Sequence, residues 1–350
     1  MSDRALFSEI RDLSAVALVN AYDQGELSPL EVTKVLIDEL DRLNPILNMV
    51  YLPTPERALE EAKASEQRWL NGTPNSPLDG VATTIKDGLL SQHEPSYRGS
   101  ATNDSDEQSW TVDAPVNARL REAGMISLGK STMPDFGILA SGYSSIHGIT
   151  RNPWDTSKNP GGSSSGAASS VACGLSPLVV GTDIVGSIRL PASFCGLFGH
   201  KPSQGRVPYY PPNAPTLVAG PMSRTVEDSA LFMHLLAQPD PRDFTALEFN
   251  DIDYLGQLEQ APRNVTLGLL TDIGFGPEVN PEVKQAIENA AKQFANLGYN
   301  IELIEAPFKK GDDACAELFY KQRCYSEFGQ YSDRMQQLSP YIYDWTRDAT

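Results

Sequence analysis

The stretch between residues 80 and 211, in which strand-like and helix-like segments alternate, constrains the fold of this chain most strongly. It is rich in glycine, serine and proline, which separate short apolar runs. Three of these runs have the length and composition of buried strands: 81–85, 125–128 and 178–180. Helical patterns separate the runs at 115–122 and 164–172. Because strands that alternate with helices bury both faces of a sheet, the sequence predicts an α/β fold.

The segments on either side of this stretch predict further helices and strands. Several helices begin at a capping residue, often followed by proline, and they are expected at 14–24, 28–44, 55–70, 225–236, 280–298 and 312–337. Short strands are expected at 48–52, 265–270 and 301–304. No repeat or long linker divides the 350 residues, so we expect one domain over residues 1–350.

The composition limits the classes of function. Apolar residues make up 40% of the chain, which suffices for a sizeable core. The 28 Lys and Arg residues against 45 Asp and Glu residues give a formal charge of −17, and such an acidic surface repels nucleic acid. No apolar run reaches the ~18 residues of a membrane span, and the start lacks the pattern of a secretory signal. We therefore expect a cytoplasmic protein that binds neither nucleic acid nor membrane.

The cysteines and histidines indicate neither a disulfide nor a metal site. The four cysteines contain no CxxC pair, so we expect reduced thiols at Cys173, Cys195, Cys315 and Cys324. The four histidines show no paired-ligand spacing, so we expect no metal ion.

Residues Gly124 to Ser131 match the phosphate-loop pattern GxxxxGK[ST]. That loop must follow a strand, yet a helical pattern precedes Gly124, and the variable residues 125–128 are themselves strand-like. Pro134 would also interrupt a helix that began at Lys130. We therefore expect a helix, a turn and a strand here instead of a phosphate-binding loop.

Residues 162–166 fit GxSxG, the nucleophile elbow of α/β-hydrolases. The elbow needs a strand directly before it, but Asn-Pro-Gly at 159–161 predicts a turn. It also needs an acid and a histidine downstream, and neither His200 nor His234 has a recognisable setting. We reject the elbow for these two reasons.

A third small-residue segment, GTDIVGSIR at 181–189, directly follows the predicted strand at 178–180. A loop of small residues that leaves a strand can align successive backbone N–H groups, and such a row can stabilise an oxyanion. Ser187, near the end of the row, could attack a carbonyl group bound there.

Two segments resemble the Gly/Ser-rich signature of the amidase signature family: NPGGSSSGAASS at 159–170 and GTDIVGSIRLP at 181–191. Further segments match that family in the same order: TIKD at 84–87, GKSTMPDFG at 129–137, RNPWD at 151–155 and KPSQGRVP at 201–208. The resemblance is collinear from Leu13 to Asp243 and weaker beyond. It implies one α/β domain with a mixed central sheet covered by helices on both faces. It also implies amide hydrolysis without a metal or organic cofactor.

The same resemblance implies roles for individual residues. The catalytic lysine falls on Lys86, the nucleophile on Ser187, and the bridging serine, which follows a cis peptide bond in the family, on Ser163. The oxyanion hole falls on the backbone N–H groups of Ile184, Val185, Gly186 and Ser187.

Five further residues are implied as neighbours of this triad. Ser164 and Thr182 are expected to support it, and Gly137 is expected to contact the substrate. Asp183 and Arg189 flank the nucleophile loop, and we interpret them as supports that fix it through charged hydrogen bonds. A plain surface ion pair is the alternative for these two.

The chemistry explains why this set of residues suits amides. Amide hydrolysis needs an activated nucleophile, charge stabilisation and a proton for the departing nitrogen. A lysine acts as a base only when neutral, which requires burial to lower its pKa from the ordinary ~10.4. Lys86 suits this role because it ends the apolar run 81–85, although a lysine whose charge reaches water is the alternative. Ser163 would then relay the proton between Lys86 and Ser187.

Three features depart from the family pattern. Val185 and Ser165 stand where the family usually has glycine. Valine keeps its N–H group but restricts φ, which points to a narrowed or rotated oxyanion hole. Family members also continue past residue 350, so we expect the chain to lack their usual C-terminal part.

Three functions therefore remain open. The first is hydrolysis of a small-molecule carboxamide to a carboxylic acid and ammonia or an amine, through an acyl-enzyme on Ser187. The second is an amidotransferase subunit that works with partner chains, similar to the amide-cleaving subunit of glutamyl-tRNA amidotransferase. The third is an inactive family member that serves as a binding protein. The sequence leaves open which amide is cleaved and whether the chain forms a homo-oligomer.

Overall fold

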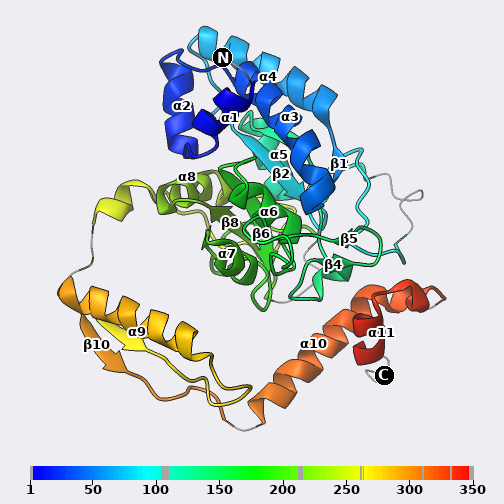
Figure 1. Cartoon of the computed structure of the whole chain (residues 1–350), viewed down its shortest axis with the longest axis vertical. Helices are drawn as coiled ribbons and strands as arrows, with labels where there is room; N and C mark the ends of the chain where they lie inside the picture. The colour runs from blue at the N-terminus through cyan, green and yellow to red at the C-terminus, as the bar shows by residue number, and fades with distance from the viewer. Residues whose placement is uncertain are drawn as a thin grey trace. The chain divides into compact units, whose positions relative to one another are not determined.

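The computed structural model describes residues 3–103, 110–211, 216–260, 262, 264–309, 311–331 and 333–346. The chain divides into two compact units (Figure 1). The larger unit comprises Met1–Leu255 and Glu327–Asp348, and the smaller one comprises Gly256–Ser326 and Ala349–Thr350. The larger unit contains the central sheet and every residue that the sequence places in the site.

A six-stranded sheet forms the centre of the larger unit, in the order β1-β3-β2-β6-β8-β7 (Figure 1). Strand β2 is parallel to both β3 and β6, whereas β1 is antiparallel to β3, and β8 is antiparallel to β6 and β7. The strands are β1 (Val50–Pro53), β2 (Ala82–Lys86), β3 (Ile126–Ser131), β6 (Leu178–Asp183), β7 (Phe198–Gly199) and β8 (Val218–Ser223). The predicted mixed α/β sheet is thus confirmed. A separate hairpin pairs β4 (Tyr143–Ser144) with β5 (Gly148–Ile149).

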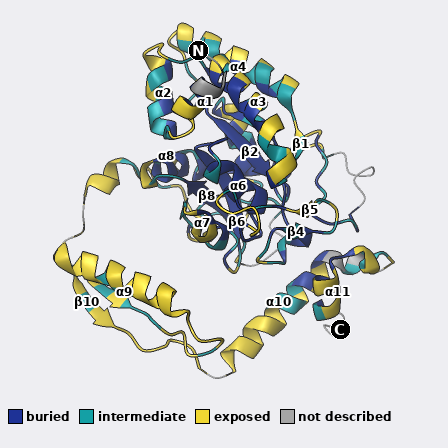
Figure 2. Ribbon diagram, viewed as in Figure 1, coloured by how far each residue is buried: buried dark blue, intermediate teal, exposed yellow. Residues whose placement is uncertain are grey.

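Helices cover both faces of this sheet, because successive side chains of each strand point to opposite faces. Along β6, Leu178 and Val180 join an apolar cluster with α5 and α8, whereas Val179 joins a second cluster with α6 and α7. A third cluster joins α1, α2, α3 and α4 to β3. Figure 2 shows this buried centre in dark blue. The helices are α1 (Asp3–Ile10), α2 (Ala15–Asp23), α3 (Pro29–Leu47), α4 (Pro55–Leu70), α5 (Pro115–Glu122), α6 (Ser165–Ala172), α7 (Arg189–Cys195) and α8 (Val226–Leu236).

Side-chain caps begin several of these helices where the sequence predicts them. The hydroxyl groups of Ser14, Ser28 and Thr225 each accept a backbone N–H bond from the first turn of their helix, at 3.0, 3.0 and 3.1 Å. Helix α3 runs to Leu47 rather than ending at Asn44. The Asn44 side-chain oxygen accepts two N–H groups beyond the helix and so fixes the turn into β1.

Some elements differ from the prediction. The sequence does not predict β8, because it contains Gly220 and Pro221, but pairing with β6 along its length stabilises it. Helices α1 and α7 are not predicted either. The single helix expected at 312–337 is wrong: α10 (Asp312–Phe328) ends at Gly329, a poor helix former. The 3₁₀ turns Gly329–Tyr331 and Met335–Gln337 and the helix α11 (Pro340–Thr346) follow it.

The smaller unit contains the strands expected at 265–270 and 301–304 and the helix expected at 280–298. Strands β9 (Thr266–Leu269) and β10 (Asn300–Leu303) pair in parallel, and α9 (Pro281–Asn296) lies between them in sequence. A 3₁₀ turn at Gly256–Glu259 precedes β9. None of the helices described is both long and apolar enough to cross a membrane.

Candidate active site

Lys86 is the last residue of β2, and its side chain is fully buried. Its Nζ atom donates hydrogen bonds to the hydroxyl oxygens of Ser163 at 2.9 Å, Ser164 at 2.9 Å and Thr182 at 2.7 Å. Thr182 lies at the end of β6, and because β2 and β6 are parallel neighbours, their carboxyl ends meet at one edge of the sheet. Removal from water disfavours the charged ammonium form of a lysine.

The loop before α6 brings Ser163 and Ser164 to this edge. The peptide bond between Gly162 and Ser163 is cis, as the resemblance implies. Gly162 admits no side chain, because a Cβ atom there would lie 2.5 Å from the carbonyl oxygen of Ser141. The Ser165 hydroxyl donates to the carbonyl oxygen of Gly161 at 2.8 Å, which ties the loop to the first turn of α6.

Ser187 lies in the loop that connects β6 to α7. The backbone N–H of Ser164 donates to the carbonyl oxygen of Ser187 at 3.3 Å, which joins the two serine-bearing loops. Ser187 is half-buried, whereas Ser163 and Ser164 are buried. In the part of the chain that is described, the hydroxyls of Ser163 and Ser187 form no hydrogen bond with each other. Such bonds are often long before a substrate binds.

The buried carboxylate of Asp183 holds this loop. Its Oδ1 atom accepts the Gly186 N–H at 2.8 Å, and its Oδ2 atom accepts the Ile188 N–H at 3.1 Å. The Arg189 side chain donates two further bonds to the same carboxylate, at 3.0 and 2.9 Å. Burial favours the protonated carboxyl, but the guanidinium and the two N–H groups outweigh it and hold the pKa of Asp183 below its ordinary value.

The Asp183 contacts also determine which backbone donors of the loop are available. Gly186 donates its N–H to Asp183, whereas within the described residues the N–H groups of Ile184, Val185 and Ser187 have no protein acceptor. Val185 is absent from the non-glycine residues with positive φ, and 58% of its surface is exposed. The valine therefore fits this loop in ordinary backbone geometry.

Gly137 borders the Ser163 hydroxyl. Its φ is +71°, and a Cβ atom at this position would lie 3.1 Å from Ser163 Oγ. Its N–H closes a turn by donating to the carbonyl oxygen of Pro134 at 2.9 Å. The backbone of residue 137 thus runs directly beside the hydroxyl that contacts Lys86.

Asp87 and Tyr51 support the site, and the sequence analysis missed both. The Asp87 carboxylate accepts the Tyr51 hydroxyl at 2.6 Å and the N–H groups of Tyr97 and Gly99 at 3.0 and 2.8 Å. Burial, followed by the charge of Asp87, raises the pKa of Tyr51. Asp87 lies beside Lys86 in the segment TIKD, which could have singled it out. Tyr51 belongs to β1, and no pattern in the sequence connects it to Lys86.

Comparison with known proteins identifies the family. A family model described as amidase matches residues 31–348. The chain belongs to the amidase signature family. It is 38% identical over 306 residues to a glutamyl-tRNA(Gln) amidotransferase subunit of Alkalilimnicola ehrlichii, covering 85% of this chain and 61% of the relative. It is 36% identical over 301 residues to the corresponding subunit of Chloroflexus aggregans, covering 83% and 60%. The chain thus spans about three fifths of the length of these relatives.

Solved structures of amidase signature enzymes have the same fold. A bacterial aryl acylamidase of this family superposes with a TM-score of 0.89 at 28% identity, over 98% of this chain and 74% of that one. The 6-aminohexanoate cyclic dimer hydrolase superposes with a TM-score of 0.86 at 26% identity, over 96% and 71%. These matches confirm the family resemblance and the α/β fold that the sequence predicts.

The two competing motifs have other roles in this amidase signature chain. The variable residues of the phosphate-loop match lie in β3, apart from Met125, and Lys130 is fully buried in that strand. Its Nζ atom donates to the carbonyl oxygen of Leu89 at 2.9 Å, and burial lowers its pKa. A loop rather than a strand precedes Ser163, so the nucleophile elbow is absent from the segment 156–166. The helix, turn and strand expected around Gly124 are thus confirmed.

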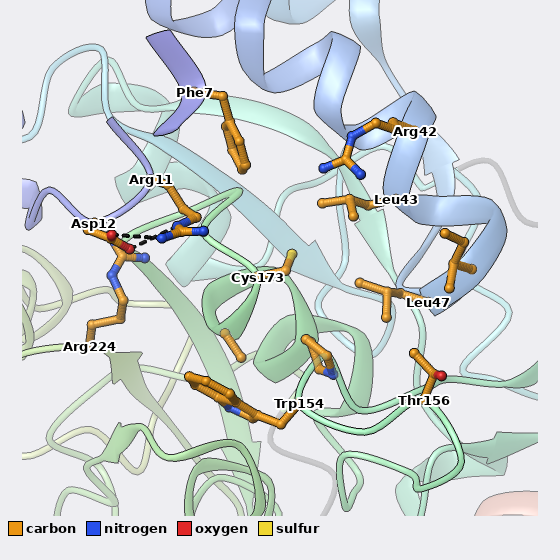
Figure 3. A pocket seen from close by; sticks show the side chains of 14 residues that line it. Phe7, Arg11, Asp12, Arg42, Leu43, Leu47, Trp154, Thr156, Cys173 and Arg224 are labelled. Atoms are coloured by element: carbon orange, nitrogen blue, oxygen red, sulfur yellow. Dashed lines mark hydrogen bonds and ion pairs between the residues drawn. The ribbon is translucent and has the colours of Figure 1, made fainter. Parts of the chain in front are cut away.

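A cavity of about 420 Å³, lined by Cys173, lies at the C-terminal end of α6 (Figure 3). The serine loop precedes the other end of this helix. Three arginines line the cavity, but each already has partners. Arg11 pairs with Asp12 at 2.9 Å, and Arg42 donates to Glu39 at 2.8 Å. Arg224 donates to two backbone carbonyls at 3.3 and 3.0 Å and also to that of Leu13. We assign this cavity no role, because its guanidinium groups serve the fold.

Proposed function

We propose that this protein hydrolyses a carboxamide through an acyl-enzyme on Ser187. The observation that carries the proposal is the fully buried Lys86, whose Nζ atom lies within 2.9 Å of the hydroxyls of Ser163 and Ser164. A lysine without access to water, in contact with serine hydroxyls at the carboxyl edge of a sheet, is placed to act as a general base. Membership of the amidase signature family supports the same reaction.

In the proposed acylation Lys86 is neutral, so its Nζ atom donates to Ser164 and Thr182 and accepts the hydroxyl of Ser163. Nζ takes the proton of that hydroxyl while Ser163 Oγ takes the proton of Ser187. Ser187 Oγ then attacks the carbonyl carbon of the amide. The backbone N–H groups of Ile184, Val185 and Ser187 stabilise the resulting oxyanion, and each well-placed donor is worth ~3 kcal/mol in the transition state. We leave Gly186 out of this set, because its N–H already binds Asp183.

Collapse of the intermediate breaks the C–N bond. The proton held by Lys86 returns through Ser163 to the departing nitrogen, which leaves as ammonia or an amine. A water molecule then attacks the acyl-enzyme with the same relay as base, and it releases the carboxylic acid and regenerates the Ser187 hydroxyl. Every proton is returned, so the cycle needs no metal ion or organic cofactor.

Fluorophosphonate labelling tests the nucleophile. We expect mass spectrometry to find one label, on Ser187, and none in the Ser187→Ala variant, which should stay folded. A label on Ser163 or Ser164 would overturn the assignment. A screen of small aliphatic, aromatic and amino-acid amides for ammonia release then identifies the substrate.

An amidotransferase subunit is the second candidate. The observation that favours it is the 38% identity to a glutamyl-tRNA(Gln) amidotransferase subunit. Such a protein would pass the ammonia released by the same serine chemistry to an acceptor held with partner chains. Release of ammonia from a simple amide by the isolated chain would favour the stand-alone amidase. Label on Ser187 without any turnover in the screen would favour the amidotransferase.

A further inference from the structure

The last described segment of the larger unit, residues 327–331 and 333–346, packs on the turn that carries Gly137 through Tyr331 and Ser339. Phe136, which precedes Gly137, is the contact point: its ring is 1% exposed and its φ is +49°. The N–H of Phe136 donates to the carbonyl oxygen of Arg98 at 2.7 Å. Residue 98 also has a positive φ, of +49°. Two irregular turns, distant in sequence, therefore depend on each other.

Side chains from the segment 327–346 lock these turns together. Glu327 Oε2 lies 2.6 Å from Arg98 Nη1, and only 6% of the Glu327 side chain is exposed. The Arg98 guanidinium carbon lies 5.3 Å from the centroid of the Phe136 ring. Tyr331 also stacks on this ring, with centroids 5.9 Å apart and an angle of 29°, and its hydroxyl donates to Asn103 at 3.1 Å.

Asp135 adds a second connection to the same segment. Its Oδ1 atom accepts the Ser339 N–H at 3.4 Å, and its Oδ2 atom accepts the Ser145 N–H at 2.9 Å. Asp135 and Phe136 are consecutive and both are buried, so the turn is fixed on both sides of its backbone.

We propose that Arg98, Glu327 and Tyr331 form a clamp that positions the Gly137 turn against the Ser163 hydroxyl. A Cβ atom at Gly137 would lie 3.1 Å from Ser163 Oγ, so a shift of the turn by a comparable distance opens or closes the space beside that hydroxyl. These three are positioning residues, since they reach Ser163 only through Phe136 and Gly137. The inference rests on the proposed function in so far as Ser163 relays the proton.

The substitution Glu327→Gln tests the clamp, because it removes the charge and keeps the shape. We expect the rate of fluorophosphonate labelling of Ser187, and kcat on the best amide, to fall about 10- to 100-fold, with a smaller change in KM. Glu327→Asp, which keeps the charge, is expected to recover part of this loss. A merely structural role would reduce the amount of folded protein and leave the rate per folded molecule unchanged.

The matched control is Asp79→Asn. Asp79 and Arg68 form an equally short buried ion pair, at 2.6 Å with exposed fractions of 0% and 25%, against 6% and 22% for Glu327 and Arg98. Asp79 precedes β2, at the end of the strand opposite Lys86. The control is expected to lower stability and to leave the labelling rate per folded molecule unchanged. Equal rate losses in both variants, or no loss with Glu327→Gln, would overturn the clamp.

Hydrogen exchange separates failure of the clamp from failure of the proposed function. The amides of Phe136 and Gly137 are both hydrogen-bonded, and we expect both to exchange faster in Glu327→Gln than in Asp79→Asn. This readout needs no activity. If Ser187 of the natural chain takes no label, the proposed function fails, and faster exchange at these two amides still supports the clamp. Unchanged exchange there refutes it.

Discussion

Replacement of Asp183 by asparagine is expected to uncouple the loop that carries Ser187 from β6. The carboxylate accepts the backbone N–H groups of Gly186, Ile188 and Arg189 and two guanidinium bonds, at distances of 2.8–3.4 Å. The asparagine amide has the same shape but only one acceptor oxygen. Its NH₂ group replaces the other carboxylate oxygen and faces the donors that were bonded to that oxygen. In either orientation, one of the N–H groups of Gly186 and Ile188 then faces another donor.

The structure sets the size of this effect. A hydrogen bond to a charged group contributes ~1.5–3 kcal/mol, and a buried donor left without a partner costs a similar amount. The Arg189 side chain is 51% exposed, so water replaces most of the hydrogen bonding that it loses in the variant. Its ion pair with Asp183 therefore contributes little to the expected loss of stability. The buried N–H groups dominate, and we expect about 3 kcal/mol of lost stability. Displacement of one oxyanion donor would slow acylation about 10²-fold.

The assay measures the fluorophosphonate labelling rate of Ser187 per folded molecule, together with urea unfolding. Arg189→Ala is the matched control, because it leaves the three backbone bonds to Asp183 in place. This variant removes only the half-exposed guanidinium. We expect it to lower the free energy of unfolding by ~1 kcal/mol or less and to slow labelling much less than Asp183→Asn does. If Arg189→Ala costs as much as Asp183→Asn in rate and stability, the ion pair holds the loop, and the argument from the buried N–H groups is refuted.

Four other outcomes follow from the same contacts. Lys86→Ala is expected to lose measurable amide turnover, and near-normal rates at neutral pH would exclude Lys86 as the base. Calorimetry with Mg-ATP is expected to show no binding to the natural chain or to Lys130→Ala. Binding to the natural chain that is lost in this variant would instead support a phosphate-binding loop at 124–131. Since the folded state holds the pKa of Asp183 below the ordinary ~3.9, its contribution to stability is present above about pH 4 and is lost as pH falls through the lowered pKa. The advantage of the natural chain over Asp183→Asn in urea midpoints should shrink accordingly, and an advantage that persists at low pH would contradict this. Val185→Gly is expected to lower the free energy of unfolding by ~0.5–1 kcal/mol through added backbone freedom and not to raise kcat, and a higher kcat on a small amide would contradict this.

The central sheet could be predicted because its signals are local. Apolar runs mark β2, β3 and β6, and helical patterns mark α5 and α6 between them. The pairing of β2 with β6 is not local, and it brings Lys86 within 2.7 Å of Thr182. The loop before α6 adds Ser163, 77 residues from Lys86, at 2.9 Å. Spacing alone does not reveal that contact; the family resemblance supplied it. The hydrogen bond from the Gly186 N–H to Asp183 depends on the conformation of one loop, so neither the spacing nor the family resemblance predicts it.

The elements that the sequence missed are stabilised by partners distant along the chain. Strand β8 contains glycine and proline, and it forms because β6 offers a long antiparallel edge. The contacts of the segment after Phe328 go to Asn103 and Asp135, more than two hundred residues earlier. Tertiary pairing of this kind overrides local propensity and leaves no pattern in a single sequence.

Val185 differs from the glycine that the family usually has here, but the loop backbone does not need glycine at this position. Glycine at this position would suggest a need for positive φ, which valine rarely adopts. Val185 has no positive φ, and its side chain is 58% exposed, so the substitution neither distorts the loop nor fills it. An oxyanion hole is made of backbone donors, and valine keeps its N–H. Val185 therefore offers no argument for an inactive binding protein, and the buried contact of Lys86 with Ser163 favours the proposed hydrolase.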